Sequence, residues 1–392
     1  MMPKSPSNLY PITIIGAGIT GLSTAYHLHK LGIGPVKLYH TPSKQALSKH
    51  IPAYVTGGCW DNFTRISHVR GGQSAALFWE FGNRAFEELK LFCLQHSLPW
   101  SQGCRLRLIC SKEEQREASQ AINELQQHGF KEAHFWSKQQ IKGFSSRVLT
   151  VQEDGKNAAI TDVVKLLEFL QANIQSQGTI INASKVLSIG EVSDGLELHL
   201  AMNQIDQTEM LVLACHFDIG ELLPDLHEAV VPVADQWSQY SIDKGCLPDL
   251  LKGKTSFLSA HHGYEWGVLQ GDGKLLGGGC RYMRKQAGIG DPKGAFDAKI
   301  ESKNREQFSS WFELGPVKVI GAGSSGSEIY PCDETPIIGP MFGTDRIVLA
   351  TGFMHLGLSY GFFAGKCLAE LIHTGYCNSL PRLFWPERLR SL

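Results

Sequence analysis

The sequence lacks the features that mark several large classes of protein. Its 37 Lys and Arg residues balance 38 Asp and Glu residues, so the net charge of −1 gives no attraction to nucleic acid or to an anionic membrane. None of the 10 cysteines forms a C-x-x-C pair, which favours reduced thiols in a cytoplasmic protein over a disulfide framework. Neither a metal-ligand spacing nor an apolar signal segment is present. We therefore expect a cytoplasmic protein with a small-molecule substrate, no nucleic-acid partner and no metal, and the oligomeric state stays open.

Residues 347–365 contain no Asp, Glu, Lys or Arg and could be taken for a membrane helix. Gly352, Gly357, Gly361 and the polar His355 interrupt the stretch, and such a segment makes a poor lipid-facing helix. A buried strand, a glycine turn and a buried helix explain it better. We expect no membrane span.

The amino-terminal segment ITIIGAGITGLSTAYHLHKLG contains a dinucleotide-binding pattern. The apolar, mostly β-branched residues 12–15 predict a strand, and a helical pattern follows up to Gly32. Between them, Gly16 permits a tight turn, Gly18 lets a pyrophosphate approach the backbone, and Gly21 lets the helix pack closely on the strand. The N–H groups at the start of that helix would face the phosphates.

The second strand of this pattern, residues 36–39, should be followed by an acid that binds the adenosine ribose, but His40 stands there. A carboxylate would contribute about 1.5–3 kcal/mol and a neutral imidazole about 1 kcal/mol, so binding should weaken without being lost. Two other interpretations are open. His40 could join Ser43 and Lys44 in binding the 2′-phosphate of NADP, or it could be merely tolerated.

A second G-x-G-x-x-G lies at Gly321, Gly323 and Gly326. No helical run follows, and Pro331 and Pro336 bracket a turn. Without a helix N-terminus to hold a phosphate, we interpret this stretch as a glycine-rich loop.

The remaining pattern alternates helices with strands. Helices are predicted by the apolar spacing of residues 74–96, 112–129, 161–178 and 362–375. Strands are predicted at 104–111, 179–189, 196–200, 210–217, 263–269, 274–282 and 345–353.

Three segments resemble the FAD-dependent D-amino-acid oxidase superfamily, which includes glycine oxidase and sarcosine oxidase. DETPIIG at 333–339 is similar to the turn before the final strand of these proteins, and ATGFMHLG at 350–357 to the turn that lies against the flavin. FTRISHVRG at 63–71 is similar to the segment that sarcosine oxidases place over the flavin ring.

The resemblance implies a mixed α/β (α+β) fold, and 392 residues suit two domains. A three-layer, Rossmann-like FAD-binding domain would comprise residues 1–71, 151–230 and 325–392. A discontinuous substrate domain with an antiparallel sheet would comprise residues 72–150 and 231–324.

The resemblance also implies an activity. Family members transfer a hydride from the carbon beside an amine nitrogen to the flavin, and O2 or another acceptor reoxidises it. One alternative is an oxidase or dehydrogenase of a 2-hydroxy acid, which needs an added base such as His355 or His68. Another is a protein that binds FAD but has lost turnover.

The site residues follow from the same resemblance. Those expected at the cofactor are Gly16, Ala17, Gly18, Thr20, Gly21, His40, Arg65, Val186, Gly352, Phe353, His355, Leu356, Gly357 and Leu358. Those expected in catalysis are His355, Arg65, His68 and Lys274. Those expected at the substrate are Arg281, Glu328 and Tyr264.

Several positions depart from the family's pattern. Glu328 replaces an arginine that binds the substrate carboxylate in glycine-oxidase-like members. If Glu328 lies about 4 Å from a bound carboxylate, the repulsion would reduce the binding free energy by about 4 kcal/mol. If it points to solvent, it would have no effect on binding. Residues 214–216 read Ala-Cys-His where A-x-G is usual. Lys274 lies one residue out of register with an oxygen-activating lysine. Gly326 stands where some relatives tether the flavin to a cysteine, so we expect non-covalent FAD, with Cys332 as a remote alternative tether.

Overall fold

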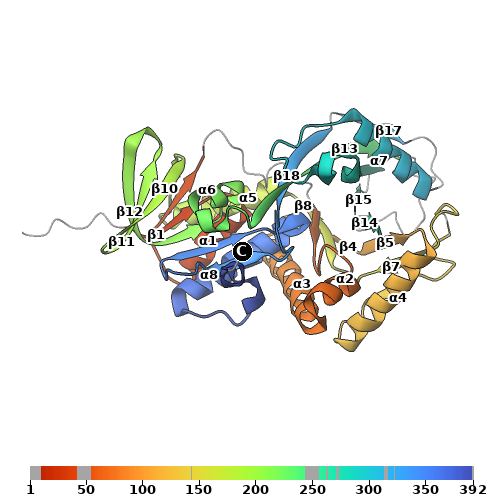
Figure 1. Ribbon diagram of the computed structural model, residues 1–392, viewed down its shortest axis with the longest axis horizontal. Helices are drawn as coiled ribbons and strands as arrows, with labels where there is room; N and C mark the ends of the chain where they lie inside the picture. Colours follow the sequence, from red (N-terminus) through yellow and green to blue (C-terminus); the bar gives the residue numbers. More distant parts are fainter. Residues whose placement is uncertain are drawn as a thin grey trace, which may run out of the picture. The chain divides into compact units, whose positions relative to one another are not determined.

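The computed structural model describes residues 10–41, 54–142, 144–242, 256–261, 264–270, 273–312, 317–321 and 323–390. The chain forms two compact units, whose elements are labelled in Figure 1. Unit 1 comprises Met1–Ile51, Val163–Val231 and Ile329–Leu392. Unit 2 comprises Pro52–Asp162 and Pro232–Glu328.

Unit 1 is built on a sheet in which eight described strands take part. The strands β20, β12, β1, β2 and β9 are parallel neighbours in that order, β10 and β11 extend antiparallel from the start of β12, and β19 lies antiparallel to β20. Their bounds are β1 (Tyr10–Ile15), β2 (Val36–His40), β9 (Ile180–Ala183), β10 (Val186–Val192), β11 (Gly195–Leu200), β12 (Gln204–Leu213), β19 (Ile337–Pro340) and β20 (Ile347–Thr351).

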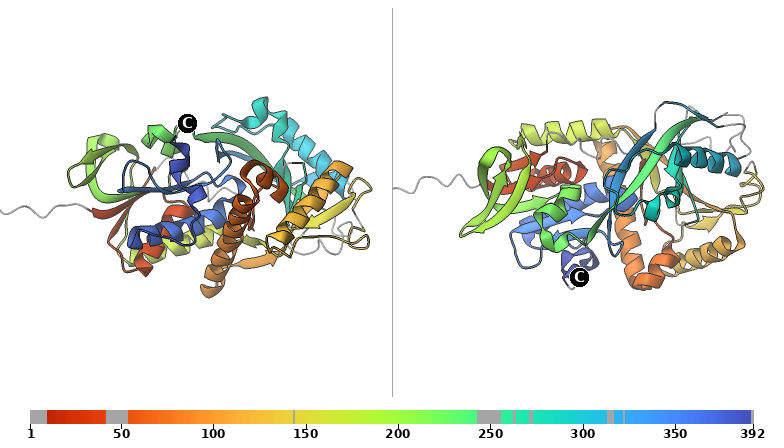
Figure 2. Two further views of the ribbon diagram at one scale, coloured as in Figure 1. Left: turned by 60° about the horizontal axis from the view of Figure 1, so that its bottom comes forward. Right: turned by 45° about the horizontal axis from the view of Figure 1, so that its top comes forward.

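The helices of unit 1 are α1 (Ile19–Lys30), α5 (Val163–Ser176), α6 (Ile219–Leu222) and α8 (Gly357–Thr374). Both views of Figure 2 show the red helix α1 beside the blue helix α8. Glycines make this contact close, because a Cβ on Gly361 would lie 2.7 Å from Oγ1 of Thr20 and one on Gly365 would lie 2.7 Å from the backbone nitrogen of Thr24. The two contacts advance by the same four residues on each helix, so α1 and α8 run parallel.

Unit 2 contains a sheet of nine described strands in the order β17, β13, β16, β15, β14, β5, β7, β6, with β18 paired to β13. A smaller sheet has the order β3, β8, β4. The bounds are β3 (Tyr54–Thr56), β4 (Trp100–Gly103), β5 (Arg105–Ile109), β6 (His134–Phe135), β7 (Thr150–Glu153), β8 (Ala158–Thr161), β13 (Val230–Ser241), β14 (Ser256–Ser259), β15 (Glu265–Gln270), β16 (Lys274–Gly279), β17 (Lys318–Val319) and β18 (Ser324–Pro331).

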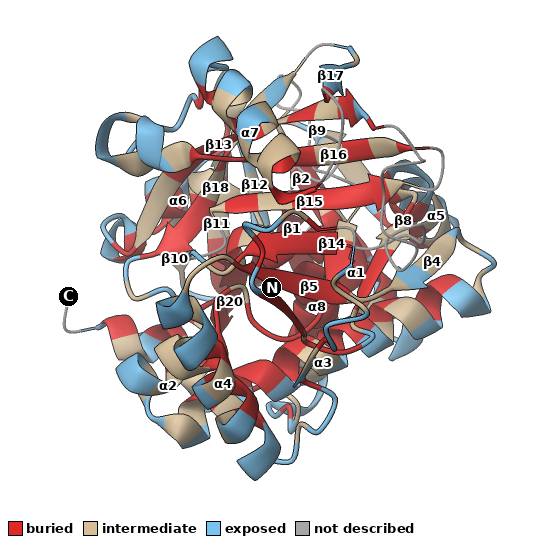
Figure 3. Cartoon of the chain, turned by 90° about the vertical axis from the view of Figure 1, so that its right-hand side faces the viewer, coloured by how far each residue is buried: buried red, intermediate tan, exposed pale blue. Residues whose placement is uncertain are grey.

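Four helices complete the described part of unit 2: α2 (Phe63–Arg70), α3 (Gly72–Gln95), α4 (Lys112–Gln127) and α7 (Ala298–Trp311). The start of α4 is set by a capping box, in which Oγ of Ser111 accepts from the backbone nitrogen of Glu114 and the Glu114 carboxylate accepts from that of Ser111. In Figure 3, α4 carries exposed residues, whereas β5, β14 and β15 are buried.

The two faces of the large sheet differ in chemistry. Leu106, Phe257 and Leu275 point to one face and pack with Phe308 of α7 in an apolar core. Side chains alternate along a strand, so Arg105 and Arg107 of β5 point to the opposite face. That face carries the buried guanidinium groups of Arg105 and Arg107.

The mixed α/β fold is confirmed, and the predicted helices at 74–96, 112–129, 161–178 and 362–375 correspond to α3, α4, α5 and α8. The second G-x-G-x-x-G runs into the strand β18, which begins at Ser324 and contains Gly326, so the predicted loop ends in a strand; no helix begins there. Residues 54–71 and 151–162 pack in unit 2, although the predicted cofactor domain included them. Contacts between distant parts of the sequence hold them there: α2 packs on α3 and α4, and β8 pairs with β3 and β4.

Candidate cofactor and active site

The turn between β1 and α1 is shaped by glycines that cannot be replaced without a clash. Gly16 has a φ of +116°, and a Cβ there would lie 2.2 Å from the carbonyl oxygen of Ala214. A Cβ on Gly21 would lie 1.8 Å from the carbonyl oxygen of Gly16. The backbone N–H of Gly16 donates to the Tyr39 carbonyl at 2.8 Å, which fixes the turn at the end of β2.

The start of α1 is suited to an anion. Gly18 is its N-cap, no side chain caps the helix, and its first turn holds no acidic residue. The first N–H groups and the positive end of the helix dipole are therefore left for a phosphate. The residues around them, Ala17, Gly18 and the buried Thr20, fit the pyrophosphate of FAD.

His40 and Val186, both predicted to contact the cofactor, lie on two strands that are not neighbours in the sheet. His40 is the last residue of β2, is half-buried, and pairs with Ala183 at the end of β9. Val186 begins β10 three residues later and is buried. Ser43 and Lys44, the proposed companions of His40 in binding a 2′-phosphate, lie outside the described residues.

The turn between β20 and α8 lies at the same edge of the sheet as the turn between β1 and α1. Gly352 has a φ of +74°, and a Cβ on it would lie 2.4 Å from Cγ of Pro331. Phe353 and the 3-10 turn η9 (Met354–Leu356) follow, and α8 begins at Gly357 without a side-chain cap. Because β1 and β20 are parallel, the N-termini of α1 and α8 meet at one edge of the sheet, where this fold class binds its ligands.

His355 in this turn is paired with a tyrosine. Its Nε2 lies 2.7 Å from the hydroxyl oxygen of Tyr330, and the two rings meet edge to face with centroids 5.9 Å apart. Tyr330 is buried in β18. Tyr330 could not be predicted as a partner, because nothing in the sequence relates it to a residue 25 positions away.

Arg65 in α2 has its guanidinium committed to partners within unit 2. Nη1 lies 3.2 Å from Oδ1 of Asp61, and Nη2 donates to Oε2 of Glu117 at 2.9 Å and to the carbonyl of Ala260 at 3.1 Å. Nε forms a further ion pair with Glu117. His68 lies on an exposed part of the same helix.

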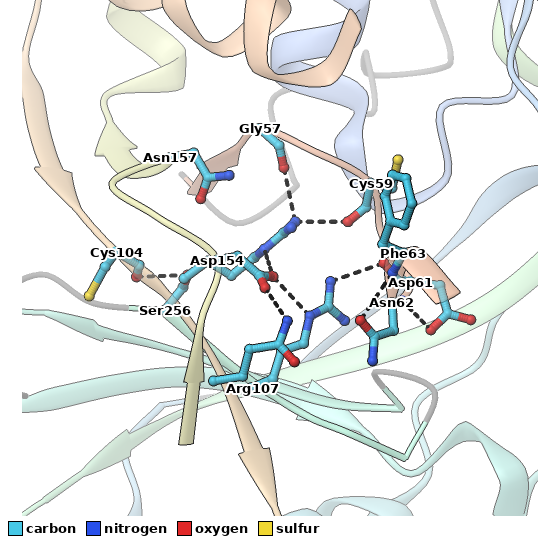
Figure 4. A network of polar contacts seen from close by, with 12 residues as sticks. Gly57, Cys59, Asp61, Asn62, Phe63, Cys104, Arg107, Asp154, Asn157 and Ser256 are labelled. Atoms are coloured by element: carbon cyan, nitrogen blue, oxygen red, sulfur yellow. Dashed lines mark hydrogen bonds and ion pairs between the residues drawn. The ribbon is translucent and has the colours of Figure 1, made fainter. Parts of the chain in front are cut away.

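A buried ionic network holds the chain segment that precedes α2 (Figure 4). Oδ2 of Asp154 accepts from Nε of Arg105 at 2.9 Å and from Nε of Arg107 at 2.8 Å. Nη1 of Arg105 donates to the carbonyls of Gly57 and Cys59. Nη2 of Arg107 donates to the carbonyl of Asp61.

Two guanidinium groups share one carboxylate at the centre of this network. Burial alone would raise the pKa of Asp154, but Arg107 and Arg105 outweigh burial and hold that pKa below its usual value. Nη2 of Arg105 is buried without a hydrogen-bond partner among the described residues. Burial raises the pKa of the neighbouring Cys59 thiol, against the opposing effect of the arginines.

The predicted substrate residues are distributed over unit 2. The Arg281 guanidinium lies 4.9 Å from the centroid of the Tyr264 ring and donates to the Ala287 carbonyl at 3.0 Å. Lys274 begins β16, on the face opposite to that of its core neighbour Leu275. Glu328 is half-buried in β18 and, as the residue two positions before Tyr330, points to the same face of the strand.

The segment Ala-Cys-His at 214–216 lies directly behind the glycine turn. Ala214 donates its N–H to the carbonyl of Ile15 at 2.8 Å. His216 has a φ of +55°, a left-handed conformation that glycine adopts without strain. The histidine thus occupies a backbone position that suits the glycine of the A-x-G pattern.

Metal ligands and membrane helices are both absent from the described residues. Among them no group of three or more His, Cys, Asp or Glu side chains could hold a metal ion. None of the described helices is both long enough and apolar enough to cross a bilayer. Residues 347–365 form β20, η9 and the first half of α8.

Comparison with known proteins gives consistent matches along the chain. The family described as "FAD dependent oxidoreductase" (DAO) matches residues 11–371. The chain is similar to YhfW of Bacillus subtilis (strain 168), a protein named for a Rieske 2Fe-2S iron-sulfur centre, with 23% identity over 400 residues that cover 96% of this chain and 71% of the relative.

Solved structures show the same fold. L-proline dehydrogenase from P. horikoshii superposes with a TM-score of 0.76 and 15% identity, covering 98% of both chains. Glycine oxidase from Geobacillus kaustophilus has a TM-score of 0.74 and 14% identity, covering 96% of this chain and 98% of its own. Iminodiacetate oxidase from Chelativorans sp. BNC1 has a TM-score of 0.74 and 16% identity, covering 96% and 99%.

Proposed function

The chain belongs to the FAD-dependent oxidoreductase (DAO) family, and from this premise we propose that it oxidises the carbon–nitrogen bond of an amine or of an amino-acid-like substrate. The observation that carries the proposal is the cradle at the sheet edge, where the uncapped N-termini of α1 and α8 meet beside Gly16 and Gly352. The fold is shared with enzymes named for the oxidation of glycine, proline and iminodiacetate. Every one of these substrates has a C–H bond beside an amine nitrogen.

The residues of unit 1 would hold FAD, which supplies the hydride acceptor when bound. The start of α1, with Ala17, Gly18 and Thr20, would bind the pyrophosphate, and His40 would lie at the ribose. Residues 352–358 and the N-terminus of α8 would support the ring system. We propose that the cofactor is held without a covalent bond, because Gly326 stands at the usual tethering position and Cys332 is exposed.

An amine substrate is favoured over a 2-hydroxy acid by the protonation chemistry. Oxidation of an alcohol carbon needs a base for the hydroxyl proton, whereas a neutral amine can donate a hydride without one. Nε2 of His355 is already hydrogen-bonded to Tyr330, and His68 is exposed on α2. Neither histidine is therefore ready to act as that base.

Glu328 indicates whether the amine substrate carries a free carboxylate. It is half-buried and shares a strand face with Tyr330, so a free carboxylate on the substrate would be repelled if it bound near this face. At an effective dielectric of 20 and a separation of about 4 Å, the repulsion between the two carboxylates is about 4 kcal/mol. This would weaken the affinity for the substrate by close to a thousandfold. We therefore propose amines without a free carboxylate as the preferred substrates.

The electron acceptor is O2 or a second redox partner. The relative named for a 2Fe-2S centre supports including an iron-sulfur protein among the candidates. The free thiols of the nine described cysteines support a cytoplasmic location.

The test is anaerobic reduction of the purified holoprotein. The released cofactor is first identified, and the flavin absorbance is then followed with matched sets of amine, amino acid, amino acid amide and 2-hydroxy acid that share one side chain. Bleaching by amines and amides is expected. Bleaching by hydroxy acids alone would replace the proposal with the alcohol alternative, and intact FAD reduced by no compound would favour a binding protein without turnover.

Two variants separate the role of Glu328 from general damage. Glu328→Arg should gain activity on small amino acids, because it restores a cation for the carboxylate. Glu328→Gln removes the charge at nearly constant shape and should show a smaller gain. Unchanged binding of every compound in both variants would show that Glu328 does not face the substrate.

A further inference from the structure

Two buried cysteines of unit 1 lie against each other at the end of α8. Cys367 lies on the helix and is 0% exposed, and Cys377 follows the helix and is 7% exposed. The two thiols share a hydrogen bond, and neither forms a disulfide in the structure. The contact depends on how the chain turns back after the helix.

The chain reverses direction directly after α8. Gly375 ends the helix in a left-handed conformation, with a φ of +73°, and donates its N–H back to a carbonyl of the last turn at 2.8 Å. Oγ1 of Thr374 donates to the carbonyl of Tyr376 at 2.7 Å. Sγ of Cys377 then donates to Oε2 of Glu370 on the helix at 3.1 Å. A hydrogen-bonded turn thus returns Cys377 to the helix surface that carries Cys367.

The two thiols differ in how readily they ionise. Burial raises the pKa of Cys367 well above its usual value. The hydrogen bond from Cys367 lowers the pKa of Cys377 and outweighs the opposing effects of burial and of the Glu370 carboxylate. The thiolate is the form that reacts with oxidants, so Cys377 should react first.

Cys377 is also the thiol that a small oxidant reaches more easily. Its neighbours Tyr376 and Asn378 are exposed, so a local opening of the turn would uncover its sulfur without disturbing the helix. Cys367 lies among buried residues of α8, such as Ala364 and Leu368. It stays in place to attack the oxidised sulfur when the turn closes again.

We propose that Cys367 and Cys377 are a redox-sensitive pair, in which hydrogen peroxide converts the two thiols to a reversible disulfide. The Cys377 thiol gives two electrons to peroxide, which forms a sulfenic acid and one water. The Cys367 thiol then attacks the sulfenic sulfur, so that the S–S bond forms and a second water leaves. A dithiol reductant reverses the reaction by exchange. The inference goes beyond the proposed function and does not depend on the amine substrate.

The disulfide would join α8 to the carboxyl-terminal segment. That segment carries Arg388, whose guanidinium binds the carboxylate of Asp333 and the carbonyl of Thr335, shortly before β19. A crosslink removes conformations of the unfolded chain. The oxidised protein should therefore unfold at a higher urea concentration than the reduced protein.

The test exposes the reduced holoprotein to a series of hydrogen peroxide concentrations. Remaining thiols are alkylated in denaturant, and the peptides are mapped by mass spectrometry. A link between Cys367 and Cys377 is expected, which dithiothreitol removes and Cys377→Ser lacks. Cys93→Ser removes a buried thiol of unit 2 and should leave the link intact. The proposal is overturned if both thiols stay reduced at concentrations that oxidise the exposed Cys332.

Two further measurements test the order of the steps and their consequence. With dimedone, which traps sulfenic acids, Cys367→Ser should be labelled at Cys377, because serine keeps a hydrogen-bond donor and removes the attacking thiol. Labelling of Cys367 in Cys377→Ser, with none of Cys377 in Cys367→Ser, would overturn the order. Peroxide should raise the urea midpoint of the native protein and of Cys93→Ser. An equal rise in Cys377→Ser would overturn the role of the pair.

Discussion

In unit 1 the candidate site is formed mainly by backbone at glycine turns and close glycine contacts. In unit 2 the segment before α2 is held in place by buried charged side chains. At the α1–α8 contact the close approaches involve glycines, and Oγ of the buried Ser23 donates to the Phe362 carbonyl at 2.6 Å. In unit 2 the segment before α2 is held by the guanidinium groups of Arg105 and Arg107, joined through Asp154. Glycine contacts depend on shape and are insensitive to pH, while an ionic network depends on every one of its charges.

Removing the shared carboxylate should have the largest effect. Asp154→Asn removes the carboxylate that two buried guanidinium groups share, and breaking a buried ion pair in this way costs about 3–5 kcal/mol. The free energy of unfolding, measured by urea denaturation with tryptophan fluorescence, should fall by this amount. Glu221→Gln is the control, because its exposed pair with Lys185 in unit 1 is worth about 0–1 kcal/mol. Equal losses in the two variants would contradict the difference between the units.

Acid should remove the stabilising effect of the Asp154 carboxylate. The folded pKa of Asp154 is lower than its unfolded value, so its stabilising effect is complete above about pH 4 and is lost as the pH falls toward the folded pKa. The native protein should therefore lose stability below about pH 4 more steeply than Asp154→Asn, which has already lost this group. Parallel stability curves of the two proteins between pH 5 and pH 3 would show that another carboxylate controls acid unfolding.

A single methyl group should damage unit 1. A Cβ on Gly365 would lie 2.7 Å from the nitrogen of Thr24 and 2.8 Å from Cβ of Ser23, so Gly365→Ala must separate α1 from α8. Overpacking of this kind costs about 1–3 kcal/mol. Bound FAD, measured by its absorbance after gel filtration, should fall too, because the two helix N-termini move apart. Gly190→Ala is the control, since a Cβ there meets no heavy atom closer than 4.0 Å.

The same difference explains what the sequence could predict. Gly16, Gly18 and Gly21 shape one turn within six residues, so their spacing was enough to predict the strand, the turn and the helix, and the resemblance identified the turn at 350–357. Arg105 and Asp154 are 49 positions apart. No local pattern pairs them. The bonds that Arg105 and Arg107 donate to the backbone carbonyls of residues 57, 59 and 61 help to hold that segment in unit 2, although the predicted cofactor domain included it.

Other features of the site escaped prediction for related reasons. The contacts of Gly361 and Gly365 with α1 could not be predicted, because they depend on how two helices that are distant in sequence pack. Tyr330 lies between two recognisable motifs and belongs to neither. The placement of His40 at the end of β2 was predicted, since it follows from the strand alone, while its proposed partners Ser43 and Lys44 lie outside the described residues.

The smallest effect is expected at His216, which stands where the A-x-G pattern has glycine. His216 has a φ of +55°, which costs a non-glycine residue about 1–2 kcal/mol, while glycine costs about 0.5–1 kcal/mol in lost chain entropy. His216→Gly should therefore raise the free energy of unfolding by about 0–1 kcal/mol, measured by urea denaturation. Met354, at a φ of +52°, is the control, because it is 5% exposed and Met354→Gly loses its apolar burial and should destabilise. A loss of stability in His216→Gly would mean that the histidine ring, which meets Phe217 edge to face with centroids 4.1 Å apart, contributes more than its backbone conformation costs.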